Sequence, residues 1–257
     1  MLKYKTINIL FFAILALLLL YERMVAVPYL AIGVLLFAYL VIQVYGSAIL
    51  STQFFLPVRS RGDKHSNSVA ITFDDGPIPG RTEKILDILK VHEVSAAFFC
   101  IGSRVAAHPG LAKRIHEAGH VLGNHSYWHG ILFDLQTAKN IGRELGDTDE
   151  VILRTIGVKP NFFRPPYGVT NPMVAKAVKK GGYKTIGWTI RSFDTFIKDS
   201  TVLMKRVTKS LKAGDVILFH DNGNTTLEIL PALLDHVSKL GLKIVRLDEL
   251  LNEKAYG

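Results

Sequence analysis

The chain of 257 residues has a single cysteine, Cys100, so it forms no internal disulfide. Charged residues are 21% of the sequence and hydrophobic residues 49%, which excludes an intrinsically disordered chain. The formal net charge is +9, but no basic stripe interleaved with aromatic residues is present, so we expect no nucleic-acid partner. Repeats and low-complexity tracts are also missing. The length suits one large domain or two small ones.

The hydrophobic excess is concentrated in residues 1–50. A first apolar run covers about 16 residues around 6–21, and a second runs from about Val25 to Leu50. The second exceeds the roughly 20 residues that cross a bilayer, whereas the first is marginal. We therefore predict two membrane-spanning helices that form a hairpin in contact with the lipid bilayer. The alternatives are a buried core helix or, for the first run, a signal-peptide core, although no small-residue cleavage site follows it.

Charges around the two runs leave the orientation open. Lys3 and Lys5 precede the first run, only Arg23 lies between the runs, and more basic residues follow the second. The positive-inside bias favours a multi-pass inner-membrane protein with both ends in the cytoplasm. A single span would instead place the C-terminal domain outside.

Residues 51–67 are polar and basic, are broken by Pro57 and Gly62, and are expected to be a linker. From residue 68 to 257, short apolar runs alternate with segments of helical periodicity, which predicts a barrel-like α/β domain with parallel strands. The expected strands are Val69–Phe73, Ala96–Ile101, Val121–His125, Phe162–Phe163, Lys184–Thr189, Val216–His220 and Lys243–Arg246. The expected helices are Thr82–Val91, Leu111–Glu117, Thr137–Gly157, Pro172–Lys180, Thr201–Leu211 and Glu228–Leu240, with Gly119, Gly181 and Gly214 at helix ends.

Chemically unusual residues follow several of these strands. In such a domain the catalytic groups gather at the carboxyl ends of the strands. Asp74 and Asp75 end the first strand before a Gly-Pro turn, although aspartate disfavours strands; a solvated turn is the alternative. His125 and His129 follow the third strand and reach one metal if Ser126 opens a helical turn. Two histidines and a carboxylate suit zinc or another divalent transition ion.

Three further segments complete the pattern. Arg164-Pro165-Pro166-Tyr167-Gly168 follows the fourth strand, and its first free backbone amide after the prolines is that of Tyr167. The fifth strand continues through Trp188 toward Asp194, and His220 ends the sixth. Ordinary rigid turns or core packing are the alternatives for each segment taken singly. Elsewhere, we expect His120 to pack or hydrogen-bond locally and Cys100 to be a small buried hydrophobe.

Together these motifs, in this order, resemble the polysaccharide deacetylase family, also called carbohydrate esterase family four, over about residues 67–250. The resemblance implies a distorted (β/α) barrel of about seven parallel strands and metal-dependent removal of acetyl groups from sugars. It implies that Asp75, His125 and His129 hold a divalent metal ion, expected to be Zn²⁺, with Co²⁺, Ni²⁺ or Mn²⁺ as alternatives.

The resemblance also implies the remaining roles. Asp74 is the general base and His220 the general acid. Arg164 orients Asp74, and Asp194 in turn holds Arg164. The backbone amide of Tyr167 meets the oxyanion. Pro165, Trp188 and Ile217, the last in place of the usual leucine of the fifth motif, belong to the substrate-binding group.

The fourth motif departs from the family pattern. Arg191 stands where the family has an aspartate, and Thr195 stands where it has a tryptophan; Asp194 is kept. The expected function is deacetylation, most readily of N-acetyl groups, on an amino-sugar glycan of the cell envelope. Two alternatives stay open: a non-catalytic glycan-binding membrane protein, and a hydrolase of another acyl or amide substrate. The sequence does not indicate the oligomeric state.

Overall fold

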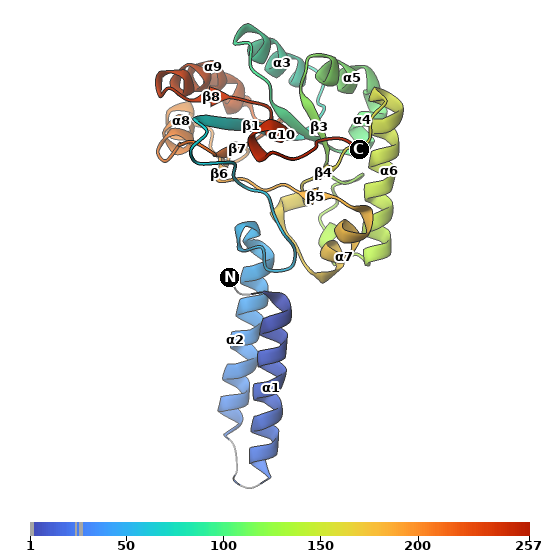
Figure 1. The fold of residues 1–257 in the computed structure, drawn as a ribbon, viewed down its shortest axis with the longest axis vertical. Coiled ribbons are helices and arrows are strands. Elements are labelled where there is room, and N and C mark those ends of the chain that lie inside the picture. The colour runs from blue at the N-terminus through green and yellow to red at the C-terminus, as the bar shows by residue number, and fades with distance from the viewer. Residues whose placement is uncertain (1–2, 24, 26–27) are drawn as a thin grey trace.

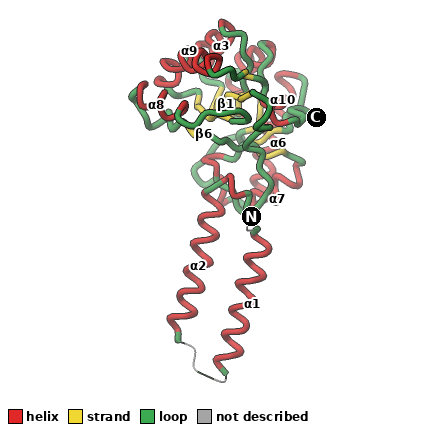
Figure 2. The backbone as a smooth tube through the Cα atoms, turned by 60° about the vertical axis from the view of Figure 1, so that its left-hand side comes forward, coloured by secondary structure: helices red, strands yellow, loops and turns green. Residues whose placement is uncertain are grey.

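Two apolar helices stand apart from the rest of the chain in the computed structural model, which describes residues 3–23, 25 and 28–257 (Figures 1 and 2). Helices α1 (Tyr4–Glu22) and α2 (Tyr29–Ala48) run antiparallel as a hairpin. Only 11% and 6% of the residues in their most apolar windows are buried. A core helix of a soluble protein is mostly buried, so this alternative does not fit the two helices.

The hairpin helices pair through the few polar groups they carry. The Tyr39 hydroxyl donates to Asn8 Oδ1 at 3.0 Å, and Gln43 Nε2 lies 3.5 Å from the same oxygen. Phe11 stacks on Tyr39, with ring centroids 4.0 Å apart. The side-chain oxygen of Asn8 therefore has its partners between the helices, while the exposed faces of the hairpin are apolar.

The segment that follows the hairpin packs onto the α/β domain. After η1 (Leu50–Thr52), the Arg59 carbonyl accepts from the Gly187 amide at 2.9 Å. The Gly62 amide donates to the Gly214 carbonyl at 2.8 Å, and Arg61 forms an ion pair with Asp215 at 2.8 Å. Residues 51–67 thus connect the hairpin to the domain as a docked strap and not as a free tether.

An open barrel of parallel strands forms the centre of the domain. The strands are β1 (Ser68–Gly76), β2 (Ala97–Cys100), β3 (Val121–Asn124), β4 (Phe162–Phe163), β5 (Lys184–Thr185), β6 (Ile190–Arg191), β7 (Val216–His220) and β8 (Lys243–Ile244). Their order is β5-β4-β3-β2-β1-β7-β6, and β8 pairs with β1. All the described ladders are parallel, and none joins β5 to β6. The half-barrel confirms the predicted fold class.

The expected strand Lys184–Thr189 is wrong as one element. Only Lys184 and Thr185 are in a strand, β5; β6 begins one residue after the expected end, at Ile190, and β5 and β6 lie at opposite edges of the open sheet. Residues 186–189 cross the gap between these edges, and Ile186 bridges to Arg59 of the strap. A chain that crosses from one edge to the other cannot continue a single ladder, so the strand is interrupted.

Helices cover the outer face of the sheet (Figure 1). They are α3 (Thr82–Val91), α4 (Gly102–Ala107), α5 (Pro109–Glu117), α6 (Ala138–Ile156), α7 (Pro172–Gly181), α8 (Ser200–Thr208) and α9 (Asn224–Lys239), with short turns η2 (Phe133–Leu135) and η3 (Pro166–Gly168). Helix α10 (Leu247–Leu251) packs instead against the inner face of the sheet. The short helices α4 and α10 were not expected. The left-handed residue after α7 is Gly182 and not Gly181, with φ of 74°.

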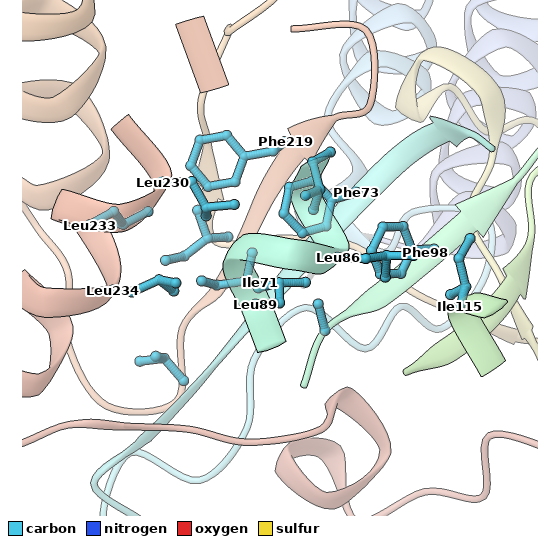
Figure 3. Close-up of a cluster of buried hydrophobic side chains, with 14 of the residues drawn as sticks. Ile71, Phe73, Leu86, Leu89, Phe98, Ile115, Phe219, Leu230, Leu233 and Leu234 are labelled. Carbon is cyan, nitrogen blue, oxygen red and sulfur yellow. The ribbon is translucent and has the colours of Figure 1, made fainter. Parts of the chain in front are cut away.

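Alternation along the strands divides the core into two layers. Ile71 and Phe73 of β1 point outward and pack with Phe98 and Phe219 against α3, α5 and α9 (Figure 3). Ala70 points to the interior, where a second cluster includes side chains of α10. This period of two fixes which strand residues reach the interior and the barrel mouth.

Candidate active site

Two adjacent carboxylates reach the same pocket because β1 is bulged. Asp74 pairs with Phe99 of β2, but the next partner of Cys100 is Gly76, so Asp75 is an extra residue with φ of 71°. Successive side chains of a regular strand point to opposite faces, and a bulge re-aims one of them. Asp74 and Asp75 therefore both line one cavity of about 220 Å³.

The two histidines converge through an irregular loop and not through a helix. Residues 125–129 form no helical turn, which corrects the expectation for Ser126. Ser126 and His129 have φ of 62° and 51°, the Ser126 amide donates to Asn124 Oδ1, and the His129 amide donates to Ser126 Oγ. These local hydrogen bonds hold the reversal, and the two imidazole centroids lie 4.7 Å apart.

Asp75, His125 and His129 are positioned as a metal site. Asp75 Oδ1 lies 3.6 Å from His125 Nε2 and 3.5 Å from His129 Nε2, and all three donor atoms lie within 4.8 Å of one another. Ligand atoms about 2.0–2.2 Å from a tetrahedral ion are about 3.3–3.6 Å apart, which matches these separations. Asp75 Oδ1 is buried without a hydrogen-bond partner among the described residues. The donor set and the orphaned oxygen fit a divalent cation.

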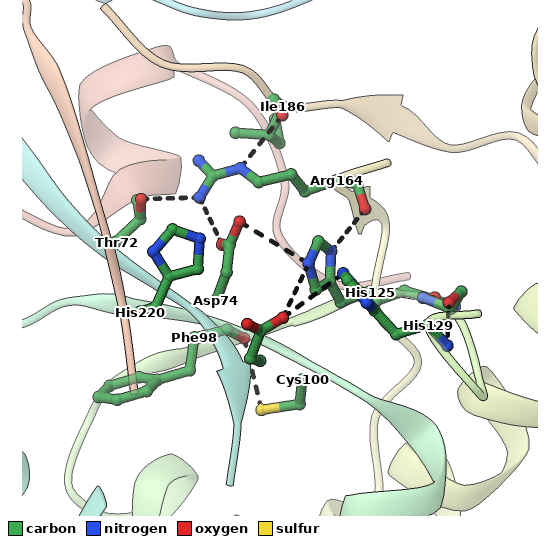
Figure 4. A network of polar contacts seen from close by, with 12 residues as sticks. Thr72, Asp74, Phe98, Cys100, His125, His129, Arg164, Ile186 and His220 are labelled. Atoms are coloured by element: carbon green, nitrogen blue, oxygen red, sulfur yellow. Dashed lines mark hydrogen bonds and ion pairs between the residues drawn. The ribbon is translucent and has the colours of Figure 1, made fainter. Parts of the chain in front are cut away.

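Surrounding groups prepare the two imidazoles for this role. His125 Nδ1 lies 2.8 Å from the Arg164 carbonyl, which only accepts, so Nδ1 carries the proton and Nε2 presents its lone pair toward Asp75 (Figure 4). Burial lowers the pKa of His129 to about 4. A ligand histidine must be neutral, and this surrounding favours that state.

Arg164 is fully buried and holds Asp74. Its Nη1 donates to Asp74 Oδ1 at 2.7 Å and to Thr72 Oγ1 at 2.8 Å, and its other nitrogens donate to the carbonyls of Ile186 and Gly187 (Figure 4). The guanidinium also lies 4.1 Å from the Phe99 ring centroid. A buried guanidinium must have hydrogen-bond partners for its N–H groups, and these contacts fix the orientation of Asp74 Oδ1.

Asp194 holds His220, which corrects the expectation that it holds Arg164. Asp194 Oδ1 lies 2.7 Å from His220 Nδ1, and Oδ2 accepts from the His220 amide at 2.8 Å. None of the described hydrogen bonds of Arg164 involves Asp194. Strand β6 pairs with β7, so Asp194, which follows β6, lies beside His220 at the end of β7. Register also places His220 opposite Asp74, since the two residues are paired across β1 and β7.

Two residues expected in the substrate-binding group lie outside the cavity wall. Ile217 lies three residues before His220, so its side chain points to the opposite face of β7 and is fully buried in the outer core. Leu218 lies two residues before His220, points to the same face as His220 and lines the cavity. Pro165 is buried, and its carbonyl accepts from the Gly168 amide, so it shapes the turn beneath Tyr167.

The expected Trp188 and Tyr167 do line the cavity. Gly168 lets them approach, because a Cβ at this residue would lie 2.5 Å from the Trp188 ring. Arg191, Phe193 and Phe196 also line it and were not assigned to the site from the sequence. Arg191 lies over the Trp188 and Phe193 rings, 5.5 and 4.9 Å from their centroids, and so puts a cation where the family pattern has an aspartate.

Left-handed backbone conformations gather around this cavity. Nine described non-glycine residues have positive φ, and four of them line it: Asp75, His129, Tyr167 and Phe193. Such conformations cost about 1–3 kcal/mol each and persist where the surrounding structure over-determines them, which is typical of active sites. Backbone geometry thus identifies the same cavity as the chemistry does.

An open barrel with an Asp-His-His cluster, flanked by a second carboxylate and a histidine, has the composition of a hydrolase site. The family model described as "Polysaccharide deacetylase" matches residues 61–186. The peptidoglycan-N-acetylglucosamine deacetylase PgdA of Listeria monocytogenes is 35% identical over 191 residues, which cover 74% of this chain and 40% of that protein. The peptidoglycan-N-acetylmuramic acid deacetylase PdaA of Bacillus subtilis is 33% identical, with 75% of this chain and 74% of that protein covered.

Solved structures agree with the sequence comparisons. The Bc1960 peptidoglycan N-acetylglucosamine deacetylase matches with a TM-score of 0.72 and 29% identity, covering 76% of this chain and 93% of that one. The chain belongs to the polysaccharide deacetylase family, a family of hydrolases that act on carbon–nitrogen bonds other than peptide bonds.

Fold similarity alone does not separate active from inactive members. The carbohydrate esterase family four pseudoenzyme BA3943 of Bacillus anthracis matches with a TM-score of 0.71 and 30% identity, over 76% of this chain and 69% of that one. The side chains in the cavity must therefore carry the argument for catalysis.

Proposed function

We propose that this chain is a membrane-anchored, metal-dependent deacetylase that removes N-acetyl groups from amino sugars of peptidoglycan or a related envelope glycan. One observation carries the proposal: Asp75, His125 and His129 converge in a single cavity, with Asp74 and His220 paired across β1 and β7 beside them. The names of PgdA and PdaA support peptidoglycan as the glycan.

Asp75, His125 and His129 would hold the cation, and their nitrogen and oxygen donors suit Zn²⁺. When bound, a divalent cation supplies Lewis-acid chemistry, which polarises a carbonyl oxygen and lowers the pKa of bound water to about 7. The protein holds Asp75 and the Nε2 atoms in place beforehand, so little reorganisation is needed on binding.

Asp74 is suited to accept the proton of the attacking water. Its Oδ1 is fixed by Arg164, and its Oδ2 lies 3.8 Å from His125 Nε2, beside the cluster. Because Asp75 belongs to the cluster and Asp74 is held by a guanidinium, the adjacent carboxylates have separate tasks. The ion pair with the buried Arg164 guanidinium fixes the orientation of the carboxylate proposed as the general base.

His220 is suited to protonate the leaving amine. Burial alone would lower its pKa, but the hydrogen bond to Asp194, together with the charges of Asp74 and Asp75, raises it above the ordinary value. Nδ1 is occupied by Asp194, so Nε2 is the nitrogen that faces the cavity. An amide nitrogen leaves poorly as an anion, and a positioned acid removes this obstacle.

The remaining walls are suited to the acetamide. The backbone amide of Tyr167 is the proposed oxyanion donor, and removal of one such donor costs about 2.7–4 kcal/mol in known cases. Trp188 and Leu218 offer apolar contact to the acetyl methyl. Arg191 favours a sugar with a carboxylate, such as N-acetylmuramic acid, as a second candidate beside N-acetylglucosamine.

The hairpin is the proposed anchor. Tyr4 of α1 donates its amide to the Phe54 carbonyl, so the start of α1 lies next to the end of α2. If both helices span the bilayer, the N-terminus and the catalytic domain share one side of it. A C-terminal reporter that is active on only one side identifies that side and hence the glycan pool that the domain meets.

Asp74→Asn tests the mechanism on full-length protein. The change keeps the shape and the Arg164 contact but removes the base, so deacetylation of an acetylated glycan should fall by about 10²–10⁴-fold with bound zinc unchanged. A chelator should abolish activity, and added Zn²⁺ or Co²⁺ should restore it. Unchanged turnover in Asp74→Asn, or full activity in metal-free protein, would reject the site; binding of glycan without any turnover in the metal-loaded wild type would favour a pseudoenzyme.

A further inference from the structure

An apolar loop lies beside the cavity and has no partner in the described part of the chain. Ile131, Leu132 and Leu135 are 82%, 64% and 74% exposed, while Phe133 between them is buried. Met173 at the start of α7 is also exposed. Single exposed apolar residues are normal on a protein surface, but a group this dense marks a contact surface. We call Ile131, Leu132, Leu135 and Met173 the apolar surface.

Short connections join this surface to the end of the hairpin. The Thr170 amide donates to the Ser47 carbonyl at 3.1 Å, and the Ser47 hydroxyl donates to the Thr170 carbonyl at 2.6 Å. One residue later, Asn171 Nδ2 donates to the Asp134 carbonyl at 2.5 Å. Both views of the fold place α7 at the end of the domain nearest the hairpin (Figures 1 and 2).

The same end of the domain carries positive charge. Lys176 and Lys179 of α7 line a groove together with Phe55, which lies seven residues after the last residue of α2. Exposed lysines can contact the anionic headgroups of a membrane, and exposed aliphatic side chains beside them can enter the boundary of the acyl chains. The bilayer surface necessarily lies at the end of α2, next to the apolar surface, whereas a protein partner could bind anywhere on the domain.

We propose that the apolar surface seats in the interfacial layer of the lipid bilayer and holds the mouth of the cavity against the membrane. This proposal rests on the hairpin anchor of the proposed function, because Ser47 lies one residue before the end of α2 and so at the membrane surface. The loop begins two residues after His129, whose carbonyl accepts from the Tyr167 hydroxyl at 3.3 Å. The cavity mouth and the membrane contact are therefore parts of one loop.

An active site that is held at the lipid surface meets a glycan carried by a lipid at a high local concentration, and meets the same glycan free in solution only at its bulk concentration. We therefore infer that acetylated glycans attached to a lipid are the preferred substrates.

Site-specific fluorescence on the full-length protein in phosphatidylcholine vesicles tests the contact. In a Cys100→Ala background, an environment-sensitive dye is attached at Leu132→Cys, at Phe37→Cys on the outward face of α2, or at Val91→Cys. Val91 is 80% exposed and ends α3, a helix on the side of the domain far from the hairpin (Figure 1). Lipids with brominated chains should quench the dye at Phe37 and Leu132 and leave that at Val91 unquenched.

Quenching at Phe37 without quenching at Leu132 overturns this inference and leaves the anchor intact. If Phe37 is not quenched, the anchor fails and this inference fails with it. A dye at Leu132 that is shielded only at high protein concentration, and not quenched by the lipid, shows that a second copy of the chain covers the surface, which also overturns the proposal.

A double variant gives an independent readout. Ile131→Ser with Leu135→Ser should leave turnover of a soluble acetylated oligosaccharide unchanged and raise KM for the same glycan on a lipid in vesicles by about tenfold. Val91→Ser is the matched control and should change neither. An equal loss on both substrates would show that the loop only supports the fold of the site.

Discussion

His220 and Asp194 form a hydrogen-bonded pair in which the carboxylate uses both oxygens. Asp194 Oδ1 lies 2.7 Å from His220 Nδ1, and Oδ2 accepts from the His220 amide and from the Thr226 hydroxyl. Asp194 is almost fully buried, so its negative charge acts on the imidazole through a medium of low polarity. The pair fixes both the tautomer and the protonation state of the proposed acid.

Replacing that carboxylate should move the pH dependence of catalysis. The pKa of His220 is raised, so the imidazole keeps its proton to a higher pH, and the alkaline limb of kcat lies correspondingly high. Asp194→Asn removes the negative charge; the pKa of His220 should fall, the limb should move to lower pH, and kcat at pH 8 should drop about 10–100-fold. Thr226→Val keeps the carboxylate and should shift the limb little. An unmoved limb in Asp194→Asn, measured by pH–rate profiles, would contradict the role of the pair.

Neighbouring residues of β7 should separate stability from substrate binding. Ile217 is buried in the outer core, so Ile217→Ala should cost about 2–5 kcal/mol of unfolding free energy and leave KM unchanged. Leu218 lines the cavity, so Leu218→Ala should enlarge the substrate site, raise KM and cost less stability, because no closed cavity forms. Thermal unfolding and initial rates measure both. The reverse pattern would show that the register of β7 is misassigned.

The order of the strand-end motifs was sufficient to predict the parallel half-barrel and the convergence of Asp75, His125 and His129. Strand alternation and the rule that parallel strands end at one edge carry this inference, because both are local or topological. Alternation counted back from His220 would also have found Leu218 in place of Ile217.

Other features depend on contacts between distant segments. Asp194 follows β6, and nothing in the local sequence shows that β6 pairs with β7, so its partner was assigned to Arg164 in error. The bulge at Asp75 and the reversal at Ser126 require left-handed backbone conformations, but neither residue is a glycine, so the sequence does not indicate them. Residues 51–67 are polar, but they dock on the barrel through backbone hydrogen bonds that composition does not reveal.

Arg191 should tune the choice of sugar. It lines the cavity, and the described contacts of its guanidinium are with aromatic rings, so its charge is available to a substrate carboxylate. Arg191→Gln should lower kcat/KM for an N-acetylmuramic acid glycan about 10–100-fold, the value of a charge-assisted hydrogen bond, and affect an N-acetylglucosamine glycan much less. Arg206→Gln is the control, because Arg206 stacks on Phe193 outside the cavity wall. Equal losses on both glycans would assign Arg191 to support of the aromatic wall.

Acid should destabilise the fold through His120. This residue is buried, as expected from the sequence, and its Nδ1 accepts from the Ala96 amide at 3.2 Å. Burial, with a smaller contribution from the positive charge of Arg246, lowers its pKa from 6.5 to about 4. Between these two values the unfolded chain binds the proton and the folded chain does not, so the free energy of unfolding falls as the pH falls.

The expected loss from His120 between pH 6.5 and 4 is about 3 kcal/mol, on top of what the carboxylates contribute. His120→Asn keeps an acceptor near the position of Nδ1 and does not titrate, so its unfolding free energy should fall less steeply over this range, whatever its value at pH 7. His65→Asn, on the exposed strap, is the matched control and should retain the slope of the wild type. Urea unfolding at a series of pH values measures the three slopes. Parallel slopes for the wild type and His120→Asn would show that His120 takes up its proton as readily in the folded chain as in the unfolded one.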